Sequence, residues 1–219
     1  MLEILRTYSA AWASGAAKTL ELAAIVWSVG LGLGIVIGTI RALLPRFLKP
    51  VSMLLFAALS SVPILVYLLW FHYPVQAALG VVVDPFFTSA LVLSVYNSLT
   101  VSELVKGSIE SFPAHFREVA MVNGLRRGIF AREVMVPMLT QGFLPGYVSS
   151  QVGALHLTLF ASLISVDELF RVAQRINSIE YRAVTVFSML AIFYFVLSFP
   201  LLLLAKWLER HYEDMRGDI

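Results

Sequence analysis

The chain has 219 residues, of which 59% are hydrophobic and 14% charged, and its mean hydropathy is +0.83. A soluble domain carries about 25% charged residues, so this composition excludes an ordinary soluble domain and indicates an integral membrane protein. The net charge of +2 is too small to indicate nucleic-acid binding. No cysteine is available for a disulfide or a thiolate metal site.

Five apolar segments are long enough to cross a bilayer, which takes roughly 20 residues of helix. We expect an all-α protein with one membrane domain, 1–219, and spans at about 18–43, 51–73, 85–105, 139–166 and 183–207. The third span is rich in Ser, Thr and Asn, which favours a helix that faces protein or water. Pro137 and Pro145, near the start of the fourth, predict an entry loop or a kinked turn there.

The distribution of positive charge predicts the orientation. The segments 41–50 and 103–133 and the C-terminal tail would lie on one side of the membrane, and together they hold most of the 16 Lys and Arg residues. The segment 72–84, on the other side, holds none. By the positive-inside rule we expect the N-terminus outside and the C-terminus in the cytosol.

The longest predicted cytosolic loop, about 108–137, is both charged and helical in pattern. Apolar residues at helical spacing surround Glu118, and Gly124 can turn the chain sharply. We therefore expect two short helices that are broken at Gly124, with Pro137 preventing continuation into the next span. A loop that lies on the anionic inner leaflet fits the same pattern.

Four motifs resemble those of one transporter family. Glu118-Val-Ala-x3-Gly124, followed by Val134-x-Val136-Pro137, resembles the Glu-Ala-Ala-x3-Gly (EAA) loop of ABC importer permeases. The run 102–113, Ser-Glu-Leu-Val-Lys-Gly-Ser-Ile-Glu-Ser-Phe-Pro, is similar to a run in the polar amino-acid permeases. So are Ser-Val-Pro-Ile-Leu-Val at 61–66 and Ser-Leu-Ile-Ser-Val-Asp-Glu-Leu at 162–169. The resemblance covers most of residues 20–210.

This resemblance implies a type I ABC importer permease fold, in which the EAA loop is a coupling helix that docks in a groove of a cytosolic ATP-binding subunit. An apolar face in a groove and a charge pair that fixes register suit that role. The implied coupling residues are Glu118, Ala120, Met121, Val122, Gly124 and Leu125.

The resemblance also implies the partners and the location. They are two ATP-binding subunits, a second permease subunit and a periplasmic or extracellular solute-binding protein, in a bacterial inner membrane. The chain has no Gly-x4-Gly-Lys-Ser/Thr motif, so ATP and Mg would be bound by the partner. We expect a transport subunit that is not an enzyme and has no cofactor or metal site of its own.

Polar residues in the third and fourth spans are candidates for the substrate pathway. They are Asn97, Ser98, Gln151, His156, Thr158 and Ser162. Each of these residue types also has a purely structural explanation. Ser and Thr often bond to a carbonyl of their own helix, an Asn can join two helices, and a His can be neutral and hydrogen-bonded. Glu103 is expected to pair with Lys106 rather than to contact cargo.

One segment departs from the family pattern. Where the family typically reads Lys-Asp-Thr-Ser-Leu, residues 156–160 read His-Leu-Thr-Leu-Phe, so both fixed charges are missing. We therefore expect a heterodimer in which a non-identical sister permease carries the charged site. The outer loop 167–182 is expected to form a gate and part of the docking surface for a binding protein, or else a solvated interfacial helix.

The leading interpretation is a permease subunit that moves an amino acid inward by alternating access, driven by a separate ATPase. The first alternative is an ABC permease for another small polar solute, such as an opine. The second is a channel or enzyme outside the ABC class. The sequence has no His-Glu-x-x-His or Gly-x-Ser-x-Gly motif to favour an enzyme.

Overall fold

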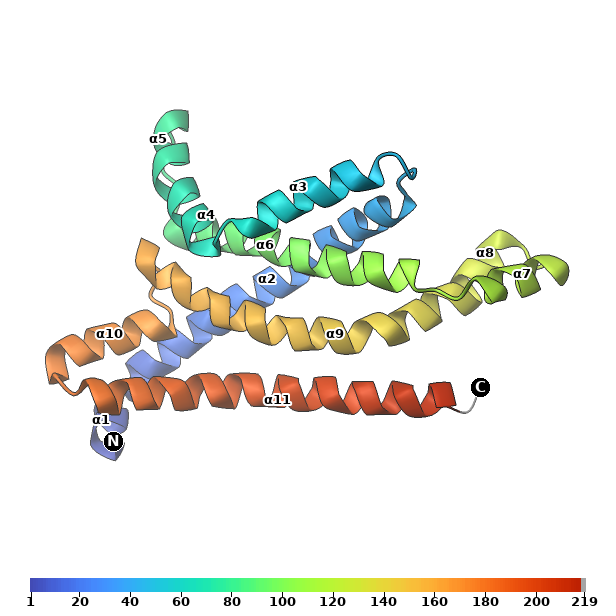
Figure 1. The fold of residues 1–219 in the computed structure, drawn as a ribbon. Coiled ribbons are helices and arrows are strands. Elements are labelled where there is room, and N and C mark those ends of the chain that lie inside the picture. Colours follow the sequence, from blue (N-terminus) through green and yellow to red (C-terminus); the bar gives the residue numbers. More distant parts are fainter. Residues whose placement is uncertain (218–219) are drawn as a thin grey trace.

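The computed structural model describes residues 1–217, with side chains as far as residue 212, and every regular element in that part of the chain is helical (Figure 1). Four long helices make up an elongated bundle: α2 (Ser9–Leu43), α6 (Pro85–Glu110), α9 (Val136–Leu157) and α11 (Ala183–Gly217). Helices α1 (Leu2–Thr7) and α10 (Leu169–Glu180) lie at the end that holds the N-terminus. Helices α7 (Ala114–Val122) and α8 (Arg127–Phe130) project at the other end.

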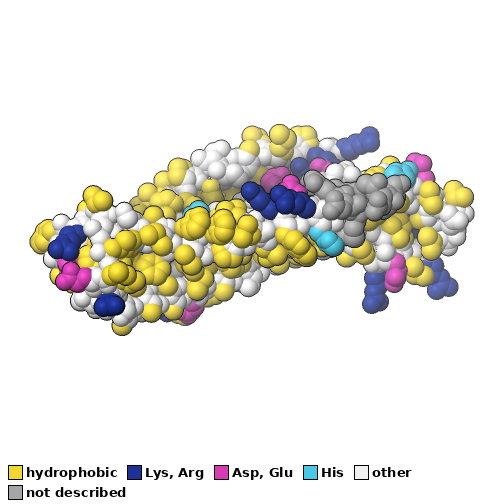
Figure 2. Space-filling model, turned by 90° about the horizontal axis from the view of Figure 1, so that it is seen from below, with side chains coloured by type: hydrophobic (Ala, Val, Ile, Leu, Met, Phe, Trp, Pro, Cys, Tyr) yellow, Lys and Arg dark blue, Asp and Glu magenta, His cyan; other side chains and the backbone are white. Residues whose placement is uncertain are grey.

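Among the described residues, three helices are long and apolar enough to cross a membrane: Ser9–Leu43, Arg127–Ile164 and Ala183–Tyr212. A fourth candidate is the bent pair Lys49–Ser61 and Ile64–Leu79, if its two limbs count as one span. Helix α6 is not in this group, and its many Ser, Thr and Asn side chains lower its hydropathy. Most of them are buried inside the bundle. In Figure 2, hydrophobic side chains cover much of the left half of the face, and charged ones lie at its left end, near its middle and on its right.

The predicted second span is helical but not straight. It begins as α3 (Lys49–Ser61), turns by 79° at Val62 and Pro63, and continues as α4 (Ile64–Trp70). A proline disfavours the α conformation of the residue before it, and Val62 is accordingly extended at φ −83° and ψ 126°. A π-helical turn, Phe71–Val75, then leads into α5 (Gln76–Leu79).

The expectation that Pro137 prevents a continuous helix is wrong. Helix α8 passes through a π-helical turn, Ala131–Met135, directly into α9, and a 3₁₀ segment, Thr158–Ile164, extends the helix further. A π-helical turn pairs each N–H with the carbonyl five residues back, so the carbonyl four residues before the proline is not forced against its ring. Pro145 also lies inside α9 without ending it.

Helices α2 and α6 are packed through a row of glycines on α2. A Cβ atom on Gly34 would lie 2.5 Å from the Val101 side chain, and one on Gly38 would lie 2.6 Å from the Ser102 carbonyl oxygen. Gly30 would meet the Asn97 side chain in the same way. Small residues four apart let two membrane helices approach closely, so this row fixes α2 against α6.

Two apolar clusters make up most of the interior, and a small third one, Val148, Ala205 and Leu208, joins α9 to α11. The larger lies among α2, α4, α6 and the end of α9, with Leu22, Leu68 and Leu93 fully buried. The other joins α1, α2, α10 and α11, and in it Trp12 stacks on Phe193 with 4.9 Å between ring centroids.

Candidate functional site

The segment between α6 and α9 folds into a compact knob, residues 112–130, with a small core of its own. Phe112 is buried and its ring centroid lies 6.0 Å from that of Phe116 and 6.1 Å from that of Phe130. Ala120, one of the predicted coupling residues, is 5% exposed and faces inward. The knob therefore has a defined shape and is not an extended loop.

The break between its two helices is at Gly124, as predicted. Gly124 has φ +65°, a conformation that favours glycine. The Leu125 amide donates to the Ala120 carbonyl at 3.0 Å, and the Gly124 amide donates to the Met121 carbonyl at 3.1 Å. This is the Schellman arrangement that ends a helix and satisfies its last carbonyls.

The outer face of the knob is apolar and open. Val122 is 87% exposed, Met121 71% and Val119 56%. Leu125, just after the turn, is 44% exposed, and Glu118 beside this face is also exposed. Large apolar side chains on a charged helix beyond the spans mark a surface that binds a partner or a membrane. The predicted coupling residues other than Ala120 and Gly124 all present their side chains here.

Asn97 and Gln151 join three helices in the middle of the bundle. The Asn97 Nδ2 atom donates to Gln151 Oε1 at 3.0 Å and to the Val26 carbonyl of α2 at 3.2 Å. Gln151 donates in turn to the Tyr147 carbonyl at 3.3 Å. Both side chains are buried, at 4% and 3% exposure. This matches the alternative in which Asn97 joins two helices.

The other four pathway candidates differ in the exposure of their side chains. The hydroxyls of Ser98, Thr158 and Ser162 each donate to a carbonyl three residues earlier, at 2.6, 2.7 and 2.7 Å, and all three are buried. His156 alone is exposed, with its ring edge against the Tyr194 ring at 5.9 Å. The described chain does not bring His156 together with the other five, whose role in a pathway stays a prediction.

The predicted Glu103–Lys106 pair is wrong. Glu103 pairs with Arg41 at 2.6 Å, and Lys106 reaches Glu110 at 3.7 Å. Arg41 is 4% exposed, although the sequence shows it as one more loop arginine after the first span. Arg41 follows Gly38 by three residues, which places it on the same face of α2 as the glycine row. This spacing was the feature of the sequence that could have shown that Arg41 faces α6.

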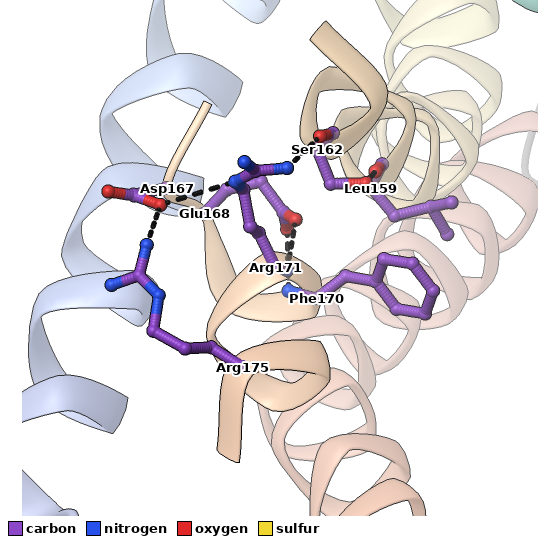
Figure 3. Close-up of polar contacts among 7 residues, drawn as sticks. All are labelled: Leu159, Ser162, Asp167, Glu168, Phe170, Arg171 and Arg175. Carbon is purple, nitrogen blue, oxygen red and sulfur yellow. Dashed lines mark hydrogen bonds and ion pairs between the residues drawn. The ribbon is translucent and has the colours of Figure 1, made fainter. Parts of the chain in front are cut away.

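At the opposite end, the residues that follow α9 form a tight polar corner, Ser162–Arg175 (Figure 3). The Arg171 guanidinium donates to the Ser162 carbonyl at 2.9 Å and pairs with Asp167 at 3.4 Å. Arg175 also pairs with Asp167. The corner thereby ties the start of α10 to the end of the fourth predicted span.

Glu168 is the buried acid of this corner. Its side chain is fully buried and accepts hydrogen bonds from the Phe170 and Arg171 amides, both at 2.8 Å, which cap the start of α10. The Tyr194 hydroxyl of α11 donates to it at 3.3 Å. Burial raises the pKa of Glu168 to about 7 despite these bonds. The charge pattern of loop 167–182 gave no sign of this burial.

Comparison with solved structures defines the fold. The fold matches "an amino acid ABC transporter with histidines" with a TM-score of 0.84 at 23% identity, covering 94% of this chain and 96% of that one. It also matches an inward-facing "MetNI methionine ABC transporter", with a TM-score of 0.76 at 15% identity, covering 91% and 95%. The fold is that of the membrane subunit of a type I ABC importer.

Residues 30–214 match the family described as "Binding-protein-dependent transport system inner membrane component", and the chain belongs to that family. The "Glutamine transport system permease protein GlnP" of Escherichia coli (strain K12) is 25% identical over 90% of both chains. The "Histidine/lysine/arginine/ornithine transport system permease protein HisM" of Salmonella typhimurium is 27% identical over 97% of both. The predicted resemblance is thus confirmed, and the chain is the permease subunit of an ATP-driven importer.

Proposed function

We propose that this permease imports amino acids or closely related solutes, and that the knob couples its spans to an ATP-binding subunit. The observation that carries the proposal is the open apolar face of the knob, with Met121 and Val122 at its centre. A rigid, self-packed knob presents this face at a fixed position, as a helix does that binds in a groove. Glu118 beside it supplies a charge that selects the register of docking.

The proposed topology is five spans, with the N-terminus outside and the C-terminus and knob in the cytosol. Support comes from the positive charges at the knob end and from the bent second span, whose two limbs together cover the predicted segment. Such a subunit would lie in a bacterial inner membrane with its long apolar helices facing lipid. The outer corner 162–175 and α10 would form part of the surface that a solute-binding protein meets.

The proposed assembly has two ATP-binding subunits, which bind ATP and Mg, and a second, non-identical permease. The missing charges at 156–160 support the non-identical partner, since His156 is the only pathway candidate with an exposed side chain in the described chain. Relatives named for glutamine and for basic amino acids support the cargo class. A relative named for octopine, 28% identical over 62% of this chain, supports opines as the alternative cargo.

The coupling role can be tested by purifying the tagged chain from its native membrane in mild detergent. We compare wild type with Glu118→Ala and Val122→Asp, and measure ATPase activity and the identity of the co-purified subunits by mass spectrometry. We expect a P-loop ATPase with the wild type and much less of it with either variant. A second permease of different sequence in the wild-type sample would support the heterodimer.

Val82→Asp is the matched control for Val122→Asp. Val82 is 99% exposed and lies in the loop between α5 and α6, away from the knob, so the same change there should leave the ATPase bound. Absence of an ATPase from the wild-type preparation would contradict the coupling role. It would favour the alternative in which the knob lies on the lipid surface.

The topology has its own test, because the chain has no cysteine of its own. We expect Val82→Cys to react with a membrane-impermeant maleimide in intact cells, and Val122→Cys to react only after the membrane is permeabilised. The reverse pattern would overturn the orientation. Uptake of labelled glutamine, arginine and octopine by the reconstituted complex would separate the two cargo classes.

A further inference from the structure

Helix α3, the first limb of the bent span, is attached to the bundle through one narrow face. None of its residues is buried, and its only partly buried side chains are Lys49, Ser52 and Phe56. Their spacing of three and four residues places them on one side of the helix. Each of the three makes a specific contact with a charged side chain of another helix, and none of the apolar clusters of the described residues includes a residue of α3.

Two of these contacts are with Arg41, at the end of α2. The Arg41 Nε atom donates to the Ser52 hydroxyl at 3.2 Å, and the guanidinium lies 3.4 Å from the centroid of the Phe56 ring. On its other side Arg41 donates to the Ser102 hydroxyl of α6 at 3.1 Å and pairs with Glu103 at 2.6 Å. One buried guanidinium thus holds three helices together.

An arginine suits this position because its planar fork can donate in several directions while an aromatic ring stacks on its face. A buried cation is costly unless its donors are satisfied, so the contacts of Arg41 support one another. The glycine row on α2 sets the closeness of α2 and α6, which brings Ser102 and Glu103 within reach of Arg41. The outward face of α3 is apolar and adds nothing to its attachment to the bundle.

The third contact links α3 to the base of the knob. Lys49, the first residue of α3, pairs at 2.6 Å with Glu110, the last residue of α6. The hydrogen bond from Lys49 holds the pKa of Glu110 below its usual range. Glu110 is only four residues before α7 begins at Ala114, so a displacement of the knob reaches this ion pair directly.

We propose that Arg41 is a positioning residue that latches α3 to the α2–α6 pair, so that movement of the knob also moves the inner limb of the bent span. The 79° break at Val62 and Pro63 supplies the joint about which α3 turns when the latch opens, and the hydrogen bond from the Tyr67 hydroxyl to the Leu59 carbonyl at 2.9 Å bridges that joint. Transmission to α3 rests on the coupling role proposed for the knob. The latch itself is a property of this chain and can be tested separately.

The test uses paired spin labels in the complete transporter, purified from its membrane and placed in nanodiscs. Met53→Cys on α3 and Val95→Cys on α6 are both exposed and report the distance between the two helices. The latch is weakened by Phe56→Leu, which removes the ring but keeps an apolar side chain, and by Arg41→Lys, which keeps the charge but loses the fork. Phe47→Leu is the matched control, because Phe47 is 75% exposed in the turn before α3.

In the wild type and in Phe47→Leu we expect one narrow distance distribution. Phe56→Leu should lower the ratio of docked to undocked α3 by roughly 2- to 30-fold, the range that the loss of one cation–π contact gives, and Arg41→Lys should lower it at least as much. Distributions of both variants that overlay the wild type would overturn the latch.

A functional readout separates a latch from a merely structural contact. With the latch weakened, ATP hydrolysis should continue while the amount of labelled glutamine imported per ATP falls. If import and ATP hydrolysis fall in proportion while α3 stays docked, Phe56 is a packing residue and not part of a latch. A preparation that contains no ATPase would refute the coupling role of the knob, whereas the distance measurement would still decide the latch.

Discussion

The two ends of the molecule differ in whether their side chains find partners within the chain. At the Glu168 corner, residues 162–175, the buried carboxylate is satisfied within the chain by two amides and the Tyr194 hydroxyl. At the knob, Met121 and Val122 are open and the Glu118 side chain is exposed. The corner therefore stabilises this subunit, whereas the knob is shaped for something outside it. Substitutions at the two ends should move different measurements.

The largest expected effect is on stability, from Glu168→Ala. This change leaves the Phe170 and Arg171 amides and the Tyr194 hydroxyl without their acceptor, which should cost roughly 2 kcal/mol in the free energy of unfolding. Unfolding in mixed SDS micelles measures it. Retention of the ATPase by the protein that remains folded should not change. A Glu168→Ala variant that has normal stability but loses the ATPase would contradict the assignment of the corner to stability and of the knob to partner binding.

The next effect is on binding, from Met121→Asp. Burying a carboxylate in an apolar groove without a partner should weaken retention of the ATP-binding subunit roughly tenfold. Stability should change by less than about 0.5 kcal/mol, because Met121 is 71% exposed. Ala114→Asp adds the same charge at an exposed position at the start of the same helix and serves as the control. Equal losses from both variants would mean that charge alone, and not the apolar face, governs docking.

The third effect is a dependence of stability on pH. The pKa of Glu168 rises from 4.5 in the unfolded chain to about 7 in the folded one, so the folded state holds this proton more tightly. Its contribution is fully present below about pH 4.5 and is lost as pH rises through about 7. We expect unfolding midpoints to fall over that window, and Glu168→Gln to flatten the slope. An unchanged slope in Glu168→Gln would assign the titration to another group.

The smallest effect is expected from Asp167→Asn in the same corner. Its ion pairs with Arg171 and Arg175 are exposed, with the Asp167 side chain at 57%. Surface pairs contribute about 0.2–1 kcal/mol and are screened by salt. We expect a loss near the lower end of that range that disappears at high ionic strength. A loss as large as that of Glu168→Ala would show that the outer rim, and not the buried acid, holds the corner together.

Local sequence predicted the knob well because its features are local. A positive φ at Gly124, two short helices and exposed apolar positions all follow from residues within one or two turns of each other. The three helices of the described chain that are long and apolar enough to cross a membrane were recognised for the same reason, since length and hydropathy are properties of single segments. The π-helical turn before Pro137 was missed because only the backbone geometry shows how the helix accommodates the ring.

Features that depend on contacts between distant segments could not be read in advance. The burial of Arg41 depends on how closely Gly38 lets α6 approach, and the burial of Glu168 on where α11 places Tyr194. Polar residues in a span are equally ambiguous. Asn97 of α6 and Gln151 of α9 face one another inside the bundle, whereas the His156 side chain is exposed. The spacing of Gln151 and His156 along α9 did not show which of the two is buried.

The unbroken helix from Arg127 to Ile164 has a mechanical consequence. At 1.5 Å per residue its 38 residues form a rod of roughly 57 Å, which begins in the knob and ends beside the Glu168 corner. A flexible loop transmits only tension, but a continuous helix also resists compression and twisting. We therefore expect a displacement of the knob to move the side chains along this helix together, His156 among them.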